Sequence, residues 1–270
     1  MLKVKDKYKS YLQTRTGIDK YNAFKTILYS DKDTLTETLF RNHISKLKFA
    51  KAISICDVGG GDGKRITDLA TKINNQFHCN IQLDFIEQSS LMCSGFETFL
   101  YNNDIFSEAE IHTAEVEDTF LKNDYDIVFL IHSIFCFADF SVFQKVFDRV
   151  KSGGVLYVVS NSSDSLLAKL KNKLDFSYQD KRYEIKDLIS DLQLHNIHYS
   201  TDNFKTDWAL NSNEADEKLS VILDWLSLGE FQSFDTSRQN ELMDLAKQLA
   251  MKNENQFLFS EAEQVLTIRK

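Results

Sequence analysis

The sequence predicts an α/β fold built around a mostly parallel β-sheet. From Ala52 onward, short apolar runs alternate with stretches whose apolar residues recur at helical spacing, as in parallel strands joined by helices. The first run, 53–58, ends in a cluster of glycines, and the run at 125–131 is the most apolar in the chain. Such a run is expected at the centre of a buried sheet.

The remaining strands and helices follow from the same alternation. Helical spacing predicts helices over 66–73, 91–100, 140–147, 165–173 and 185–194. Between and after them, apolar runs predict strands at 81–87, 109–113, 155–160 and 197–201. A last strand is predicted at 264–269 and is expected to run antiparallel to its neighbours.

Helical segments are expected at both ends of this sheet. Residues 1–50 form a predicted N-terminal cap or lid, and residues 51–270 form the main domain with a helical insertion at about 203–256. Leucine-rich spacing predicts insertion helices at 219–226 and 242–249, the first of them ended by Gly229. The cap either packs on the sheet or closes over a small ligand.

Composition excludes several classes of function. The net charge is −8, and the 32 Lys and Arg residues are scattered, so nucleic acid and anionic membranes are not expected partners. The four cysteines have no CxxC spacing, and we expect reduced thiols and no metal site. The Lys-rich N-terminus has no apolar segment, so we expect a cytoplasmic protein. A monomer is favoured.

The glycine cluster predicts a cofactor site. A strand that ends in glycines and leads into a helix lets backbone N–H groups approach a ligand closely. The G-x-G-x-x-G dinucleotide fingerprint needs a third glycine where Lys64 stands. The spacing here, with the residues Asp57, Gly59, Gly61 and Gly63, instead resembles motif I of class I S-adenosylmethionine-dependent methyltransferases.

The ends of the next two strands complete this resemblance. Glu87, followed by Gln88, stands where that family has a carboxylate that binds the ribose hydroxyls, and a carboxylate can accept two hydrogen bonds from a vicinal diol. The loop after the third strand contacts adenine in these enzymes, which implicates Ala114 and Glu115. Alone, Asp57 could be a cap and Glu87 a solvated strand end.

Two methyltransferase subclasses do not fit. Nucleic-acid amino-methyltransferases carry an Asn/Asp-Pro-Pro-aromatic motif after the fourth strand, and this chain has no proline. Metal-dependent catechol-type enzymes place acidic ligands in the same loop, which here has no acidic residue before Asp139.

Over nearly its whole length the sequence resembles the histamine N-methyltransferase family. Besides the helical N-terminal segment, the supporting stretches are 55–63, 127–139, 158–164, 222–226 and 257–268, which follow one another in the family's order. The resemblance implies methyl transfer to a nitrogen of a small amine or imidazole. Gly59, Glu87 and Ile131 would contact S-adenosylmethionine.

The resemblance also implies residues around the substrate. His132 and Glu261 stand where the family has a glutamine and an asparagine that orient the substrate, and His132 could act as a base. Asp19 is the nearest candidate for the acidic residue that meets the substrate amine. Tyr8, Tyr11 and Phe135 are predicted to line the pocket.

Two alternatives remain open on the sequence. Metal-independent enzymes that methylate an oxygen of a small phenol or carboxylate share this fold. The replacement of both amides by His132 and Glu261 also allows a protein that binds S-adenosylmethionine without catalysis.

Overall fold

The structure is a computed structural model that describes residues 10–28, 34–119, 121, 124–174 and 183–270. The chain divides into two compact units. Unit 1 comprises 1–34, 161–181 and 203–264, and unit 2 comprises 35–160, 182–202 and 265–270.

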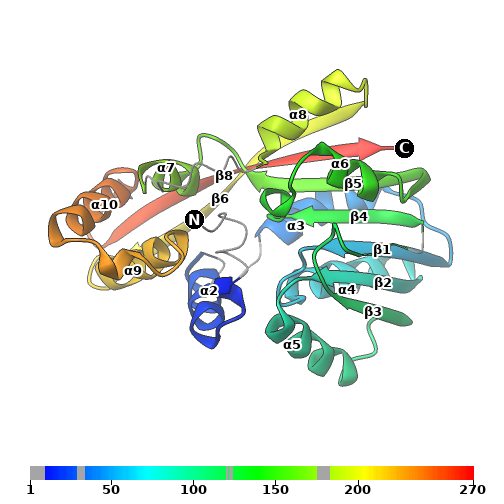
Figure 1. Cartoon of the computed structure of the whole chain (residues 1–270), viewed down its shortest axis with the longest axis horizontal. Helices are drawn as coiled ribbons and strands as arrows, with labels where there is room; N and C mark the ends of the chain where they lie inside the picture. The colour runs from blue at the N-terminus through cyan, green and yellow to red at the C-terminus, as the bar shows by residue number, and fades with distance from the viewer. Residues whose placement is uncertain (1–9, 29–33, 120, 122–123, 175–182) are drawn as a thin grey trace. The chain divides into compact units, whose positions relative to one another are not determined.

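The described residues contain an eight-stranded sheet whose order is β3-β2-β1-β4-β5-β8-β6, with β7 paired to β8 (Figure 1). The pairs β3–β2, β2–β1, β1–β4 and β4–β5 are all parallel. The strands span β1 Ala52–Val58, β2 Asn80–Glu87, β3 Glu108–Thr113, β4 Tyr125–Ile131, β5 Val150–Asn161, β6 Tyr199–Asn211, β7 Met251–Lys252 and β8 Gln256–Arg269.

The strand order reverses direction at β1, which pairs with β2 on one side and β4 on the other. In open α/β sheets this reversal leaves a crevice at the carboxyl ends of the strands, because the connections leave toward opposite faces. The end of β1 is therefore where this fold is expected to bind a ligand.

Strand β8 is antiparallel to β5, as the sequence predicts. Near the start of β5, Gly153 N donates to Lys270 O, and just beyond its end Ser162 N donates to Ala262 O, each at 2.8 Å. The partner number falls as the β5 number rises, so the two strands run in opposite directions (Figure 1).

Helices cover the sheet of unit 2 on both faces. Helices α6 (Phe140–Phe147) and α8 (Ile185–Leu194) share one core with Cys56, Val128 and their neighbours on the sheet. Helix α5 (Ser90–Tyr101) packs on the opposite face, where the Phe96 and Phe85 ring centroids are 4.4 Å apart. Unit 2 also contains α4 (Lys64–Phe77) and, from its second residue onward, α3 (Thr34–Asn42).

Unit 1 is built on a helical cluster. Helix α9 (Ala215–Leu226) packs against α2 (Arg15–Leu28), α7 (Leu166–Lys173) and α10 (Thr236–Gln248). Its buried residues are Ala215, Leu219 and the continuous segment 222–226. A helix that is buried around so much of its circumference is a central element of a core.

Three strands differ from their predictions by several residues. β5 begins at Val150 instead of 155, β6 continues to Asn211, and β8 begins at Gln256 instead of 264. In β6 and β8, buried residues alternate with exposed or partly exposed ones, for example Thr206, Trp208 and Leu210 in β6. Because buried polar and charged residues interrupt the apolar pattern, the hydrophobicity of the sequence does not mark these segments as strands.

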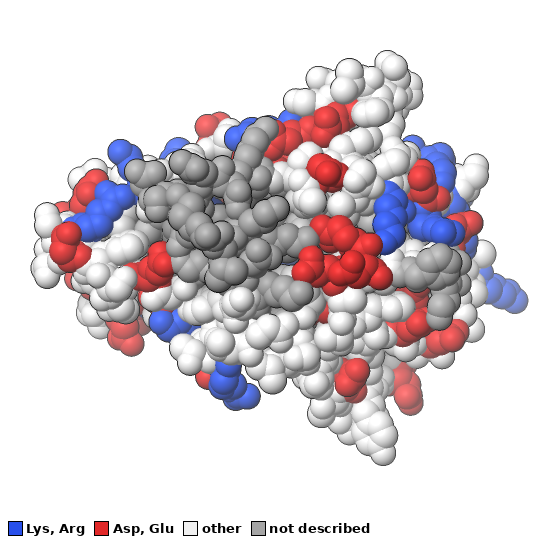
Figure 2. Space-filling view, in the orientation of Figure 1, with Lys and Arg blue, Asp and Glu red and all other residues white. Residues whose placement is uncertain are grey.

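No helix in the described part of the chain is both long and apolar enough to span a membrane. On the face shown in Figure 2, acidic side chains form a compact group near the centre, basic side chains lie mostly nearer the edges, and no continuous basic surface is visible outside the grey region.

Candidate functional site

The glycine loop after β1 adopts a backbone that only glycine fits well. Gly59, Gly61 and Gly63 have φ of 72°, 62° and 72°, in the left-handed region that side chains with a Cβ rarely adopt. At Gly59 an added Cβ would lie 2.4 Å from Ser133 Cβ, and at Gly63 it would lie 2.2 Å from the Phe96 ring. The loop is therefore held between β4 and α5.

Glu87 ties this loop to the end of β2. Its side chain is only 6% exposed, its Oε2 accepts from Gly61 N at 3.0 Å and its Oε1 accepts from Ser89 N at 2.8 Å. Burial raises the pKa of the Glu87 carboxyl, although these backbone donors lower it. Each carboxylate oxygen can accept a second hydrogen bond. The site thus holds a preoriented acceptor next to the loop.

A second carboxyl group is buried at the end of β1. The pKa of Asp57 is raised to about 7, mainly by burial, with Arg65 lowering it and Glu87 and Asp62 adding to the rise. The Gly59 and Gly60 N–H groups both point to Ile86 O, at 2.8 and 3.3 Å. These bonds fix the first half of the loop to β2.

The end of β3 contributes a tight turn. Ala114 and Glu115 are partly buried, and Glu115 O accepts from Asp118 N at 3.1 Å and from Thr119 Oγ1 at 2.8 Å. Gln88, after β2, is also partly buried. Since β1, β2 and β3 are neighbouring parallel strands, these residues and the glycine loop lie along one edge of the sheet.

His132 follows β4 at the same edge and has an unusual backbone. Its φ is 56°, and its N–H donates to Val159 O at 2.8 Å. Histidine in the left-handed region carries a modest conformational cost, and such residues gather at functional sites. Ile131 is the last residue of β4, and Phe135 is partly buried in the short helix η2 (Ile134–Cys136).

Ser133 is a site residue that the sequence analysis missed. It is 3% exposed, and its Oγ has no hydrogen-bond partner among the residues that the structure describes. A buried hydroxyl without a partner is costly, and it lies against Gly59. A ligand atom at this loop could satisfy it. A single serine gives no sequence signal of this role.

Glu261 lies in unit 1, at the N-terminus of α7. Its carboxylate accepts from Asn161 Nδ2 at 2.9 Å and from Leu167 N at 3.2 Å, and only 3% of the residue is exposed. Burial raises its pKa to about 7, although the hydrogen bond from Ser165 lowers it. Glu261 therefore has a structural role at α7, where helical N–H groups need acceptors.

The predicted substrate residues of unit 1 have different surroundings. Asp19 is exposed on α2 and pairs with Arg15, with 3.2 Å between Oδ1 and Nε. Tyr11 is partly buried against Gly229, and its hydroxyl has no hydrogen-bond partner in the described part of the chain. Burial raises the pKa of Tyr11 to about 12, and Asp224 contributes. Tyr8 lies outside the described residues.

Tyr11 belongs to an aromatic cluster whose other three members are not among the predicted site residues. The Trp225 ring centroid lies 5.9 Å from that of Tyr11, 5.1 Å from Tyr21 and 5.7 Å from Phe24. We call these four residues the Trp225 cluster. The neighbouring Asp224 is buried and accepts from Lys20 Nζ through Oδ2, while its Oδ1 has no hydrogen-bond partner within the described ranges.

Comparison with known proteins identifies the fold. No protein-family model matches the sequence, and no curated protein matches it. The solved structures that resemble the chain over most of its length include three methyltransferases. The first is a putative methyltransferase from Bacillus halodurans C-125, which is 15% identical with a TM-score of 0.56, covering 88% of this chain and 99% of that one.

The other two were solved with ligands. The plantazolicin methyltransferase BamL, in complex with a triazolic desmethylPZN analog and SAH, is 14% identical with a TM-score of 0.55, covering 97% of this chain and 94% of its own. The second is phosphoethanolamine N-methyltransferase 2 from Haemonchus contortus, in complex with phosphomonomethylethanolamine and S-adenosylhomocysteine. It is 14% identical with a TM-score of 0.57, and the match covers 97% of this chain and 60% of that one.

These likenesses confirm the predicted fold. The chain has the α/β Rossmann-like fold of methyltransferases, with a mostly parallel mixed sheet and flanking helices. At this level of identity the shared property is the fold, and function has to be argued from the residues of the site.

Proposed function

We propose that the protein is an S-adenosylmethionine-dependent methyltransferase that methylates a nitrogen of a small amine or imidazole-type molecule. The observation that carries the proposal is the buried Glu87 carboxylate, which Gly61 N holds beside the glycine loop. An acceptor fixed in this way suits the two ribose hydroxyls of an adenosyl group.

The surrounding residues fit the same cofactor. The positive-φ glycines let the loop backbone pack directly against Ser133 and Phe96, and Ser133 Oγ has no partner within the described residues. Ala114, Glu115 and Gln88 would surround the adenine, and Ile131 would border the site. When bound, S-adenosylmethionine would supply the methyl group on a sulfonium. No residue would then need to activate the donor.

The protein's own contribution to catalysis would be mainly positional. Methyl transfer needs the acceptor in line with the methyl carbon and water excluded, and such orientation can lower a barrier by several kcal/mol. His132, at the end of β4, would keep the acceptor nitrogen unprotonated or take its proton afterwards. Phe135, three residues further on, would form part of the apolar wall.

The proposed nitrogen acceptor rests on the resemblance of the sequence to the histamine N-methyltransferase family and on His132, which follows β4 at the same sheet edge as Glu87. An imidazole has the intrinsic pKa to accept a proton from an amine or imidazole nitrogen near neutral pH.

Thermal unfolding with candidate cofactors tests the first half of the proposal. We expect S-adenosylmethionine and S-adenosylhomocysteine to raise the melting temperature, because a ligand that binds only the folded state stabilises it. NAD at the same concentration is the control and should have no effect. Stabilisation by NAD alone would overturn the cofactor assignment.

A methyl-transfer screen tests the second half. The purified protein is incubated with labelled S-adenosylmethionine and panels of amines, imidazoles, phenols and carboxylic acids, and methylated products are identified by mass. Turnover only on oxygen would replace the nitrogen assignment by O-methylation. Tight cofactor binding with no turnover on any panel would favour a non-catalytic protein, in keeping with the structural use of Glu261 at α7.

A further inference from the structure

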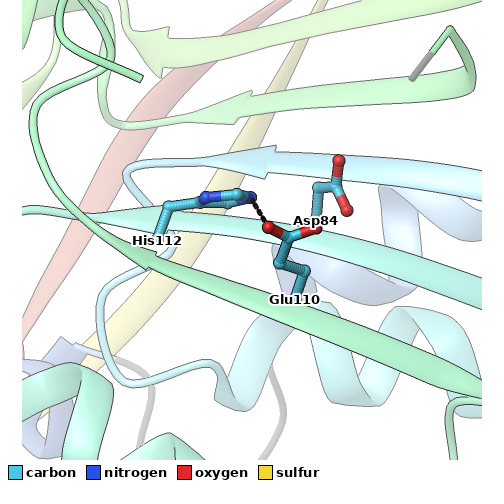
Figure 3. A group of neighbouring side chains, drawn as sticks. All are labelled: Asp84, Glu110 and His112. Atoms are coloured by element: carbon cyan, nitrogen blue, oxygen red, sulfur yellow. Dashed lines mark ion pairs between the residues drawn. The ribbon is translucent and has the colours of Figure 1, made fainter. Parts of the chain in front are cut away.

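Three side chains that can bind a metal lie together on one face of the sheet, in unit 2. Asp84 comes from β2, and Glu110 and His112 come from β3 (Figure 3). In the parallel register Asp84 pairs with Glu110, and Ile86 pairs with His112. Because side chains alternate along a strand, residues 84, 110 and 112 all point to the same side.

The ligand atoms of this group are close enough to share an ion. One atom from each residue lies within 4.8 Å of the others. The imidazole of His112 points toward Glu110, with 3.9 Å between Nε2 and Oε1 (Figure 3). His112 Nε2 is buried and has no hydrogen-bond partner among the described residues. An ion pair of that length contributes little and leaves this nitrogen unsatisfied.

The residues around Asp84, Glu110 and His112 orient these side chains, as the outer partners of metal ligands do. Asp84 is 7% exposed, and its Oδ2 accepts a hydrogen bond from the Tyr125 hydroxyl. Partners of this kind fix the orientation of ligating carboxylates. On the other side, Glu110 is 48% exposed, which leaves an opening for an ion and its water.

From this geometry we propose that Asp84, Glu110 and His112 bind a divalent transition-metal ion, with Zn²⁺ as the representative. A nitrogen and two carboxylates are ligands that zinc accepts, whereas Mg²⁺ prefers oxygen alone. The ion would offset the repulsion between two adjacent carboxylates and would link β3, at the end of the sheet order, to β2. This group shares no residue with the proposed methyl-transfer site.

Zinc titration of the metal-free full-length protein tests the proposal. We expect calorimetry to show one zinc ion bound per chain. Free zinc at about 100 times its Kd should raise the melting temperature by about 5 °C. Mg²⁺ at the same concentration should have no effect. Replacing the ligands, in His112→Gln and Glu110→Gln, should weaken zinc binding by more than the ~10-fold that the loss of an outer partner costs.

A matched variant separates this site from adventitious binding. His198 is an exposed histidine outside the group, and His198→Gln should bind zinc as the wild type does. Melting temperatures without metal show that each variant is folded. Absence of zinc binding, or unchanged affinity in both His112→Gln and Glu110→Gln, would overturn the proposal. S-adenosylmethionine binding is measured in parallel, so failure of one proposal is distinguishable from failure of the other.

Discussion

The Glu87 carboxylate serves the fold and the proposed cofactor at once, because it holds Gly61 N and Ser89 N while facing the loop. In Glu87→Gln the charge and one acceptor are lost. We expect cofactor affinity to fall about 10- to 100-fold and the free energy of unfolding to fall by ~1–3 kcal/mol. Calorimetry and urea denaturation measure these effects. The exposed Glu97→Gln on α5 is the control, and unchanged affinity in Glu87→Gln would refute the role.

Gly59 allows backbone strain and steric contact to be separated. Gly153 has a similar φ of 82°, but a Cβ added there would have nothing within 4 Å, whereas a Cβ added at Gly59 would lie 2.4 Å from Ser133. Gly153→Ala should therefore lower the free energy of unfolding by about 1–2 kcal/mol, which is the cost of placing a residue with a Cβ in the left-handed conformation. Gly59→Ala should cost more in urea denaturation and also weaken cofactor binding. If both variants lose the same free energy of unfolding, the loop can move to accommodate a Cβ at residue 59 without a steric cost.

His132 can be tested without disturbing its backbone. Asparagine tolerates the left-handed region, so His132→Asn should fold normally. If His132 handles the acceptor's proton, we expect kcat to fall about 100-fold while cofactor affinity stays nearly constant. Once an acceptor is found, steady-state kinetics and calorimetry measure both. A kcat equal to that of the wild type would exclude this function.

At the residue scale, the sequence predicted the site unevenly. The glycines and Glu87 were recognisable because they lie close together along two successive strands. Ser133 gave no signal, and Asp84, Glu110 and His112 become neighbours only through the β2–β3 register. The resemblance assigns Glu261 to the substrate, whereas its burial at α7 depends on packing that no local pattern encodes.

At the scale of elements, the helix α7 depends on a carboxylate from β8. Burial raises the pKa of Glu261 from its ordinary 4.5 to about 7. The folded protein thus binds this proton more tightly than the unfolded chain, so its contribution to stability is fully present below pH 4.5 and is lost as the pH rises through 7.

Glu261→Gln keeps an acceptor for α7 and removes the titration. Relative to wild type, we expect its free energy of unfolding to increase between pH 4.5 and 7.5, by on the order of 2–3 kcal/mol. Urea denaturation across this range measures the difference, with the exposed Glu254→Gln as the control. A constant difference across the range would show that Glu261 does not titrate there.

Helices and parallel strands were predictable where one period of apolar residues dominates. The strands at 81–87 and 125–131 and the helix at 185–194 agree with β2, β4 and α8 to within one residue. The predicted strands are shorter than β6 and β8 because buried polar residues, such as Thr206 and Glu261, occupy inward positions that the apolar pattern does not mark. Glu261 is buried where it contacts α7, which is distant in sequence, and the periodicity of a strand does not report such packing.

At the scale of the whole molecule, hydrogen exchange should map the proposed cofactor. The candidate residues lie at the carboxyl ends of β1, β2, β3 and β4. With S-adenosylhomocysteine we expect slower exchange at 59–63, 87–89, 114–119 and 131–135, because a bound ligand suppresses local opening. Segments such as 236–248 in α10 serve as an internal reference. Protection spread evenly over the chain would contradict a site at this edge.

The place of β8 in the sheet has a consequence for how the chain is made. β8 is the last strand in sequence, yet it lies between β5 and β6. During synthesis, β5 and β6 must therefore wait with open hydrogen-bonding edges until residues 256–269 leave the ribosome. Open edges of this kind invite aggregation and chaperone binding. The nascent chain should thus need protection until its final strand closes the gap.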